Sequence, residues 1–223
     1  MSAHLLHAFT GASHRASPVD LLVVLFGLSL VPLLAVSVTS FTRIVVVLGL
    51  LRASLGTQSL PPNSVLVALA MLLSGVVMMP TLERIQSQTL VPYYGHRIST
   101  GVALERSAGE LRRFMLRQTR ASDVAVFARL AARSARPNRV AGDASFSVVT
   151  AAFMVGELRA AFAMGFALAL PFAVIDLVVA SVMMSLGMFM VSPSSIALPL
   201  KLLLFVAADG WAMVCGALIA SFR

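Results

Sequence analysis

The stretch Leu170–Trp211, LPFAVIDLVVASVMMSLGMFMVSPSSIALPLKLLLFVAADGW, decides the fold of this chain. Its pattern predicts two long apolar helices that are joined by a short loop containing methionines. One charged side chain, Asp176, precedes the loop, and two, Lys201 and Asp209, follow it. The first helix extends back to about residue 160, so it would be roughly 42 Å long, more than the hydrocarbon thickness of about 30 Å. The stretch is therefore typical of a protein that crosses a membrane.

Composition supports the same class of protein. Across the 223 residues, 59% of side chains are hydrophobic and 12% are charged, whereas soluble proteins average about 45–50% and about 25%. The net charge of +8 is uneven, because residues 82–147 hold eleven arginines against five acids. Such a basic region can bind nucleic acid or an anionic membrane surface, or can simply be solvated. Few aromatic residues and no nucleic-acid-binding motif accompany the arginines, so no nucleic-acid partner is expected.

Four segments are predicted along the chain: a polar N-terminal segment at 1–18, an apolar helical hairpin at 19–81, a basic helical domain at 82–147 and a C-terminal apolar hairpin at 148–223. The first segment lacks the charged region and apolar run of a signal peptide. The sequence thus predicts an all-α integral membrane protein with about four apolar helices in hairpins. A helical domain outside the membrane separates the second of these helices from the third.

The first hairpin contains apolar runs of unequal length. Residues 19–38 are nearly all apolar and predict a membrane helix. The run Ile44–Leu51 is too short to span, so it is interpreted as a continuation of that helix or as an interfacial turn. Ser64–Met79 predicts the second apolar helix, which Pro80 is expected to end. That helix would be slightly short for a membrane, which favours packing inside protein.

The rest of the chain also predicts helices. Between residues 99 and 134, apolar side chains recur at helical spacing among arginines, which predicts two or three amphipathic helices. A loop is predicted at 133–142. A third apolar segment starts near residue 146 and runs through Glu157 into the hairpin, whose last helix is predicted over 196–222.

Two arginines, Arg43 and Arg52, flank the short apolar run of the first hairpin. Positive residues in short loops favour the cytoplasmic side, which would place residues 82–147 outside the cytoplasm. The eleven arginines of that region argue the opposite, although the rule weakens for loops of about 60 residues or more. Charge alone leaves the orientation open.

Three long motifs occur in order: SFTRIVVVLGLLRASLG followed by LPPN (40–63), LRRFMLRQTRASDVAVFARLA (111–131) and IDLVVASVMMSLGMFMVSPSSIALPLKLLLFVAADGW (175–211). They resemble the signatures of the FliP family, the flagellar type III export-gate proteins. The positions taken as its signature are Phe41, Arg43, Arg52, Pro61, Pro62 and Trp211. The injectisome counterpart, SctR, shares the last motif, so a virulence type III secretion system is the nearest alternative.

The resemblance implies a channel-forming subunit of the flagellar export gate, in the bacterial inner membrane and the flagellar basal body. Such a subunit is expected to form a homo-oligomeric ring that passes unfolded flagellar proteins, with residues 82–147 in the periplasm. The implied partners are FliQ, FliR, FlhA and FlhB, with FliO during assembly. The alternative of another class is a self-contained solute or ion transporter with Asp176 as its binding acid, for which no internal repeat is found.

Charges inside apolar helices need partners, because a carboxylate in a membrane helix costs about 2.5–3.5 kcal/mol. Counted from the loop ends, Asp176 and Asp209 lie about 18 Å and about 21 Å along their helices, and Lys201 about 9 Å. The two acids are thus predicted to be level, suiting either a shared proton or separate structural hydrogen bonds. Lys201 does not match Asp176 in height. Glu157 and Lys201 are therefore predicted to contact neighbouring subunits, the alternative being ordinary charges at helix ends.

The loop residues Met188, Phe189 and Met190 have two interpretations. In a lone hairpin they would anchor the turn at the membrane interface. In a ring, the loops would meet near the axis, where flexible methionines could close a pore around varied polypeptides. The resemblance implies the second role, a gasket in the export channel.

No arrangement of residues predicts catalysis. The histidines, at positions 4, 7, 14 and 96, lie near neither cysteine nor acid at metal-ligand spacing. Cys215 lies within an apolar helix and is interpreted as a small core residue. The sequence also lacks phosphate-loop, GxSxG and HExxH motifs. No enzymatic activity, cofactor or metal ion is expected.

Overall fold

The computed structural model describes residues 35–57, 59–134, 145–188 and 190–222, together with single positions between 22 and 33. The chain divides into two compact units, Met1–Val36 and Ser37–Arg223. In the first unit the described positions are helical and mostly exposed. The predicted segment 1–18 and much of the predicted helix 19–38 lie outside the described residues, as does most of the predicted loop 133–142.

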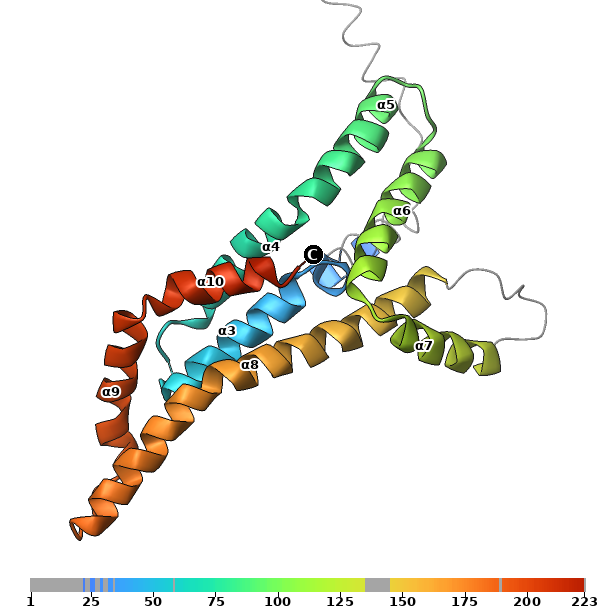
Figure 1. The fold of residues 1–223 in the computed structure, drawn as a ribbon. Helices are drawn as coiled ribbons and strands as arrows, with labels where there is room; N and C mark the ends of the chain where they lie inside the picture. Colours follow the sequence, from blue (N-terminus) through green and yellow to red (C-terminus); the bar gives the residue numbers. More distant parts are fainter. Residues whose placement is uncertain are drawn as a thin grey trace, which may run out of the picture. The chain divides into compact units, whose positions relative to one another are not determined.

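Every element of regular structure in the described residues is a helix, which confirms the predicted all-α class (Figure 1). The second unit contains α3 (Phe41–Leu55), α4 (Asn63–Ile85), a π-helix (Gln86–Leu90), α5 (Val91–Tyr94), α6 (Thr100–Gln118), α7 (Ala121–Ser134), α8 (Phe146–Ser185), α9 (Pro193–Ala207) and α10 (Gly210–Ala220). Each apolar segment predicted beyond residue 40 corresponds to a helix, but several helix ends differ from the prediction.

Helix α3 lies at the centre of the core of the second unit. It starts after a break at Ser40, and its fully buried side chains are Ile44, Val47, Leu48 and Leu51. This spacing puts them on one helix face, which packs mainly against α8 (Figure 1). The interpretation of Ile44–Leu51 as an interfacial turn is therefore wrong, because the run is the interior of a core helix.

Helix α4 continues well past its predicted end. It contains Pro80 in its interior and leads through the π-helix into α5, which ends at Tyr94 (Figure 1). A proline removes one backbone donor, and a helix that packs against neighbouring helices accommodates this loss. The prediction that Pro80 ends the helix is therefore wrong, and the continuous helical path is long enough to cross a membrane.

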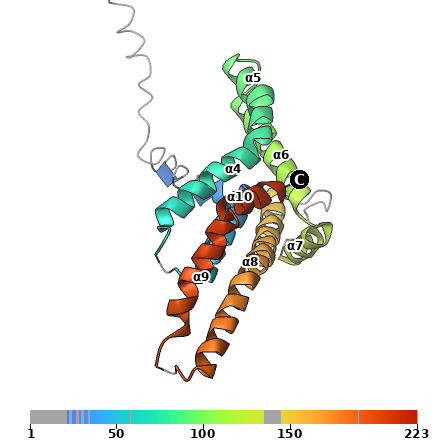
Figure 2. The ribbon, with the colours of Figure 1, turned by 60° about the vertical axis from the view of Figure 1, so that its left-hand side comes forward.

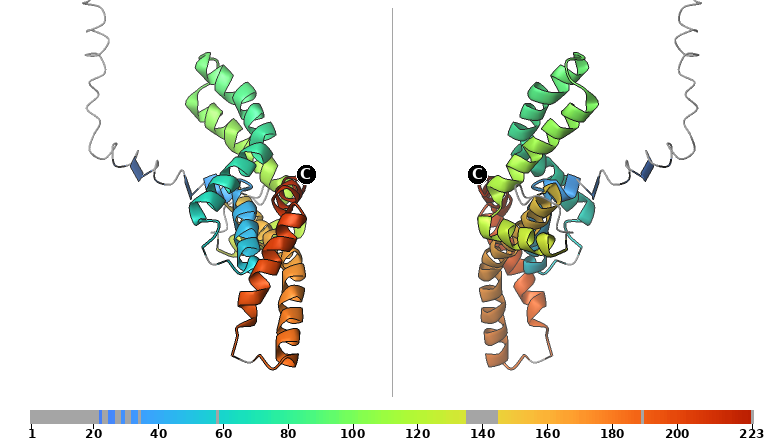
Figure 3. Two further views of the ribbon diagram at one scale, coloured as in Figure 1. Left: turned by 90° about the vertical axis from the view of Figure 1, so that its left-hand side faces the viewer. Right: turned by 90° about the vertical axis from the view of Figure 1, so that its right-hand side faces the viewer.

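The amphipathic helices predicted between residues 99 and 134 are present as α6 and α7. Ser99 caps α6, since its hydroxyl accepts a hydrogen bond from the Val102 amide at 3.4 Å. Helix α6 packs against α4 and α8 (Figure 3). The buried side chains of the hydrophobic cluster at these contacts are Val38, Met78, Phe114, Met115, Val149 and Phe153. The basic region is thus joined to the apolar helices through a hydrophobic core.

The C-terminal stretch forms three helices, α8, α9 and α10. Helix α8 continues through Pro171 for 40 residues, and α9 runs back beside its C-terminal part (Figure 2). The chain then bends by 65° between α9 and α10, where Asp209 has a left-handed backbone with φ 47°. A Cβ atom on Gly210 would collide with the Phe205 ring. The single helix predicted over 196–222 is therefore wrong.

Two helical paths in the described residues, Asn63–Tyr94 and Phe146–Ser185, are long and apolar enough to cross a membrane. The bent pair of α9 and α10 makes a third if the pair is one span. Many large apolar side chains on these helices are exposed, which suits contact with lipid or with other subunits. The chain is thus a helical membrane protein, while the boundary between its membrane and outer parts stays a prediction.

Candidate functional site

Two ion pairs lie among the apolar helices, and the first joins Arg43 of α3 to Glu157 of α8. Arg43 Nε donates to Glu157 Oε2 at 2.9 Å, and Nη2 donates to Oε1 at 2.6 Å. Glu157 is 0% exposed and Arg43 is also buried. This two-bond geometry satisfies both carboxylate oxygens, which a buried ion pair requires.

The same arginine also holds the C-terminal residues. Arg43 Nη1 donates to the backbone oxygen and to the hydroxyl of Ser221, both at 3.0 Å. Its guanidinium carbon lies 3.9 Å from the centroid of the Phe222 ring, a cation–π distance. One side chain therefore connects α3, α8 and the end of α10.

These contacts remove the charge argument for orientation. Arg43 is buried and paired, so it is not a free flanking charge. Arg52 Nη1 donates to the Pro61 oxygen at 3.3 Å and to Asn63 Oδ1 at 2.5 Å. It thereby holds the turn between α3 and α4. Because both arginines have these structural roles, the positive-inside rule cannot be applied to them as to free charges.

The second ion pair joins Lys201 of α9 to Asp176 of α8. Lys201 Nζ lies 2.5 Å from Asp176 Oδ2 and also donates to the backbone oxygen of Ser54 at 3.1 Å. The lysine is buried, whereas the aspartate side chain is 48% exposed. Helices α8 and α9 are thus joined to each other and, through Ser54, to the C-terminal end of α3.

The predicted mismatch between Lys201 and Asp176 is therefore wrong. Residue heights along two helices match only where both helices leave the loop at the same level and run straight. The four-carbon stem of lysine also lets the ammonium group reach along the neighbouring helix. Since Lys201 lies eight residues, roughly 12 Å of helix, before Asp209, this pairing does not support the prediction that Asp176 and Asp209 are level.

Glu157 and Lys201 both have partners within the chain. A neighbouring subunit is not needed to satisfy either charge, so the reason for predicting inter-subunit contacts is gone. Contacts of these residues across a ring stay a prediction. Asp209 is exposed and precedes α10 at the bend, where it has no ion-pair partner among the described residues.

The loop between α8 and α9, here called the hairpin tip (residues 186–192), exposes methionine. Met190 is 98% exposed, and Met188 is exposed to a lesser degree. The Met188 amide donates to the Met183 oxygen at 3.0 Å, and Gly187 supplies the positive φ of 72° that the turn needs. Phe189 lies outside the described residues. The gasket role of these residues stays a prediction.

The remaining signature residues have structural positions. Phe41 is the first residue of α3 and packs against the main core. Trp211 meets the Phe205 ring edge to face, with centroids 5.2 Å apart, beside the bend. Pro61 and Pro62 form the turn that Arg52 holds. Among the described residues, no group of three or more His, Cys, Asp or Glu side chains is arranged to hold a metal ion.

Comparison with known proteins decides the family. The model of the FliP family matches residues 24–218. The chain belongs to the FliP family. A relative from Caulobacter vibrioides, called flagellar biosynthetic protein FliP, is 46% identical over 222 residues, covering 100% of this chain and 83% of the relative. A relative of the same name from Bacillus subtilis is 41% identical over 207 residues, covering 93% of each chain.

A third FliP relative, from Pectobacterium carotovorum, is 47% identical over 206 residues, covering 92% of this chain and 78% of the relative. Arg43 stands among the positions taken as the family signature from the resemblance, but its partner Glu157 does not. The one sequence signal for a partner of Arg43 is that charged residues inside apolar helices usually pair with one another. The charges of the C-terminal stretch carry no sign in the sequence that α3 packs against α8.

Proposed function

We propose that this chain is a channel-forming subunit of the flagellar type III protein export gate in the bacterial inner membrane. Several copies form a ring, and unfolded flagellar proteins pass through its centre. The names of its FliP relatives, which call them flagellar biosynthetic proteins, favour the flagellar system over the injectisome. The candidate spans support a multi-pass membrane protein.

The observation that carries the channel role is the exposed methionine at the hairpin tip. Met190 is almost fully exposed, and Leu186, Met188 and Val191 of the same tip are exposed apolar residues too, so a surface that covers this apolar group is expected in the assembly. The tips of neighbouring copies supply such a surface in a ring. Methionine is unbranched and flexible, so packed tips can seal against one another and yield to polypeptides of varied sequence.

The two ion pairs hold helices α8 and α9 of the hairpin to α3. Lys201 connects α9 to α8 and to Ser54 of α3, and Arg43 connects α3 to α8. These contacts hold the hairpin to α3 on the side away from the tip. The exposed apolar faces of α4, α8 and α9 are the surfaces on which further copies, FliQ and FliR would pack. The other proposed partners are FliO, during assembly, and the gate proteins FlhA and FlhB. We place residues 82–147 in the periplasm.

Cysteine cross-linking in membranes tests this proposal. In a Cys215→Ser background, which removes the single cysteine of the chain, Met190→Cys is compared with Ala132→Cys on exposed α7. Both are produced with the partner proteins in a flagellated host that lacks its own homologue. The proposal expects oxidant-induced dimers from Met190→Cys and few from Ala132→Cys. Full flagellar protein secretion without any cross-link at position 190 would contradict it.

A further inference from the structure

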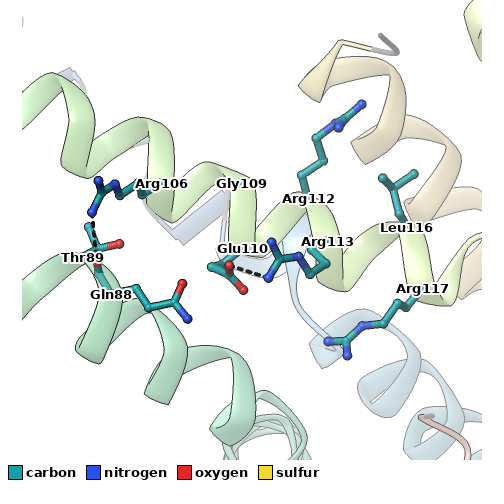
Figure 4. A pocket seen from close by; sticks show the side chains of 9 residues that line it. All are labelled: Gln88, Thr89, Arg106, Gly109, Glu110, Arg112, Arg113, Leu116 and Arg117. Atoms are coloured by element: carbon teal, nitrogen blue, oxygen red, sulfur yellow. Dashed lines mark hydrogen bonds and ion pairs between the residues drawn. The ribbon is translucent and has the colours of Figure 1, made fainter.

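A basic cleft lies outside the apolar hairpin, between the π-helix and α6 (Figure 4). Its volume is about 730 Å³, and its lining residues are Gln88, Thr89, Arg106, Gly109, Glu110, Arg112, Arg113, Leu116 and Arg117. In Figure 4, Arg106 reaches across from α6 toward Gln88 and Thr89, while Arg113 and Glu110 lie farther along α6. π-Helices are uncommon and are often found at functional sites.

The cleft carries more positive charge than its own acid can neutralise. Four arginines and one glutamate line it. Glu110 is buried and already accepts from Arg113 at 2.8 Å and from Arg84 at 3.1 Å. In the described part of the chain, no carboxylate pairs with Arg106 or Arg117. Guanidinium groups gathered in a cleft attract anions.

A second observation points to a ligand in the same cleft. Thr89 is 1% exposed, and its hydroxyl oxygen has no hydrogen-bond partner among the residues that the structure describes. A buried polar atom without a partner is unfavourable, so such atoms in folded proteins usually meet a ligand, ion or water. Arg106 Nη1 donates to the backbone oxygen of Gln88 at 3.3 Å, which holds its guanidinium at the residue that precedes Thr89.

We propose that this cleft binds a phosphate group, with guanidinium forks from α6 on one side and the Thr89 hydroxyl on the other. Arginine binds phosphate oxygens through paired N–H donors, and a hydroxyl can add one more hydrogen bond. A carboxylate at Glu110 does not oppose the binding, because two arginines already neutralise it.

The source of the phosphate is a lipid headgroup or a soluble phosphate, and the position of the cleft favours the headgroup. The apolar run of α4 gives way to charged residues at Glu83 and Arg84. Arg117 lines a neighbouring cleft with Val77 and Pro80, so it lies level with the end of that run. Basic pockets beside membrane helices can bind the anionic headgroups of lipids.

The test measures lipid retained by the purified full-length protein in native mass spectrometry, after incubation with phosphatidylglycerol in detergent. Inorganic phosphate is then added as a competitor. Arg106→Gln with Arg117→Gln removes two cleft charges. The matched control, Arg97→Gln with Arg129→Gln, removes two charges from exposed positions outside the cleft. Thr89→Val replaces the buried hydroxyl with a methyl group and leaves the shape of the side chain nearly unchanged.

The cleft double variant is expected to retain phosphatidylglycerol about tenfold more weakly, and Thr89→Val several-fold more weakly. The control is expected to match the wild type. Thr89→Val should keep the wild-type melting temperature, because the Thr89 hydroxyl has no partner to lose in the described part of the chain. Displacement of the lipid by millimolar phosphate assigns the site to phosphate of either source, and resistance to phosphate assigns it to the lipid headgroup.

Three results would overturn the proposal. Equal loss in the cleft and control double variants would mean that net charge alone attracts the lipid. Wild-type retention by Thr89→Val would mean that the phosphate does not bind the Thr89 hydroxyl, so the site would not be the one proposed. Binding of neither phosphatidylglycerol nor phosphate would leave an acidic protein segment as the partner of the arginines.

Discussion

Arg43 and Glu157 lie 114 positions apart in the chain, yet they form a buried ion pair with two hydrogen bonds. The pair joins α3 to the N-terminal half of α8. Because Arg43 also binds Ser221, α3, α8 and the C-terminal residues meet at one guanidinium. A buried arginine deprived of its acid would remain charged and unpaired.

Glu157→Gln is expected to destabilise the protein by about 3–5 kcal/mol, the usual cost of breaking a buried ion pair by removing one partner. Arg159→Gln is the matched control on the same helix. Its pair with Asp123 is partly exposed, so its loss should cost less than about 1 kcal/mol. Thermal unfolding in detergent and the amount of protein in membranes measure both. Equal stability of the two variants would show that the buried pair does not hold α3 to α8.

Helix packing between α3 and α8 is expected to be sensitive to Gly165. A Cβ atom there would collide with the Leu50 side chain, so Gly165→Ala should destabilise by about 1–3 kcal/mol. Gly156 lies on the same helix, and a Cβ atom added to it would meet open space. Gly156→Ala should therefore be neutral or stabilising by up to about 1 kcal/mol. Equal melting temperatures for the two variants would contradict this packing.

The second ion pair separates contacts within a chain from contacts between subunits. A double-mutant cycle of Asp176→Asn and Lys201→Gln is expected to give a coupling energy of about 0.5–1 kcal/mol in the detergent-purified monomer, since Asp176 is half-exposed. A cycle of Glu157→Gln and Lys201→Gln should give none there. Coupling between Glu157 and Lys201 that appears only in the assembled ring would establish the predicted inter-subunit contact.

The sequence predicted the helices better than their ends. Buried helix faces need apolar residues at regular intervals, so the apolar runs and the helical spacing of apolar residues in α6 and α7 are visible in the sequence. Pro80 was expected to end α4, because the support that neighbouring helices give to a proline is a tertiary property. The break after α9 did have a local signal, since Asp209-Gly210 is a frequent turn dipeptide. The strong apolar character of the run outweighed it.

The partners of the buried charges were not predictable by counting along helices. Counting assumes straight helices that start at one level, whereas Lys201 reaches Asp176 through its long side chain. Arg43 finds Glu157 only because α3 packs against α8, a contact between distant parts of the chain. The cleft beside Thr89 likewise depends on the π-helix, which no sequence pattern indicated.

The most direct test of the channel role asks whether an export substrate touches the hairpin tip. A photo-reactive amino acid is placed at position 190 or, as a control, at position 132 of α7. A flagellar protein fused to a domain that cannot unfold is then stalled during export. The account predicts a light-dependent adduct between this chain and the stalled substrate from position 190 and none from position 132. A stalled substrate that forms no adduct at position 190 would contradict it, because the polypeptide would then pass elsewhere.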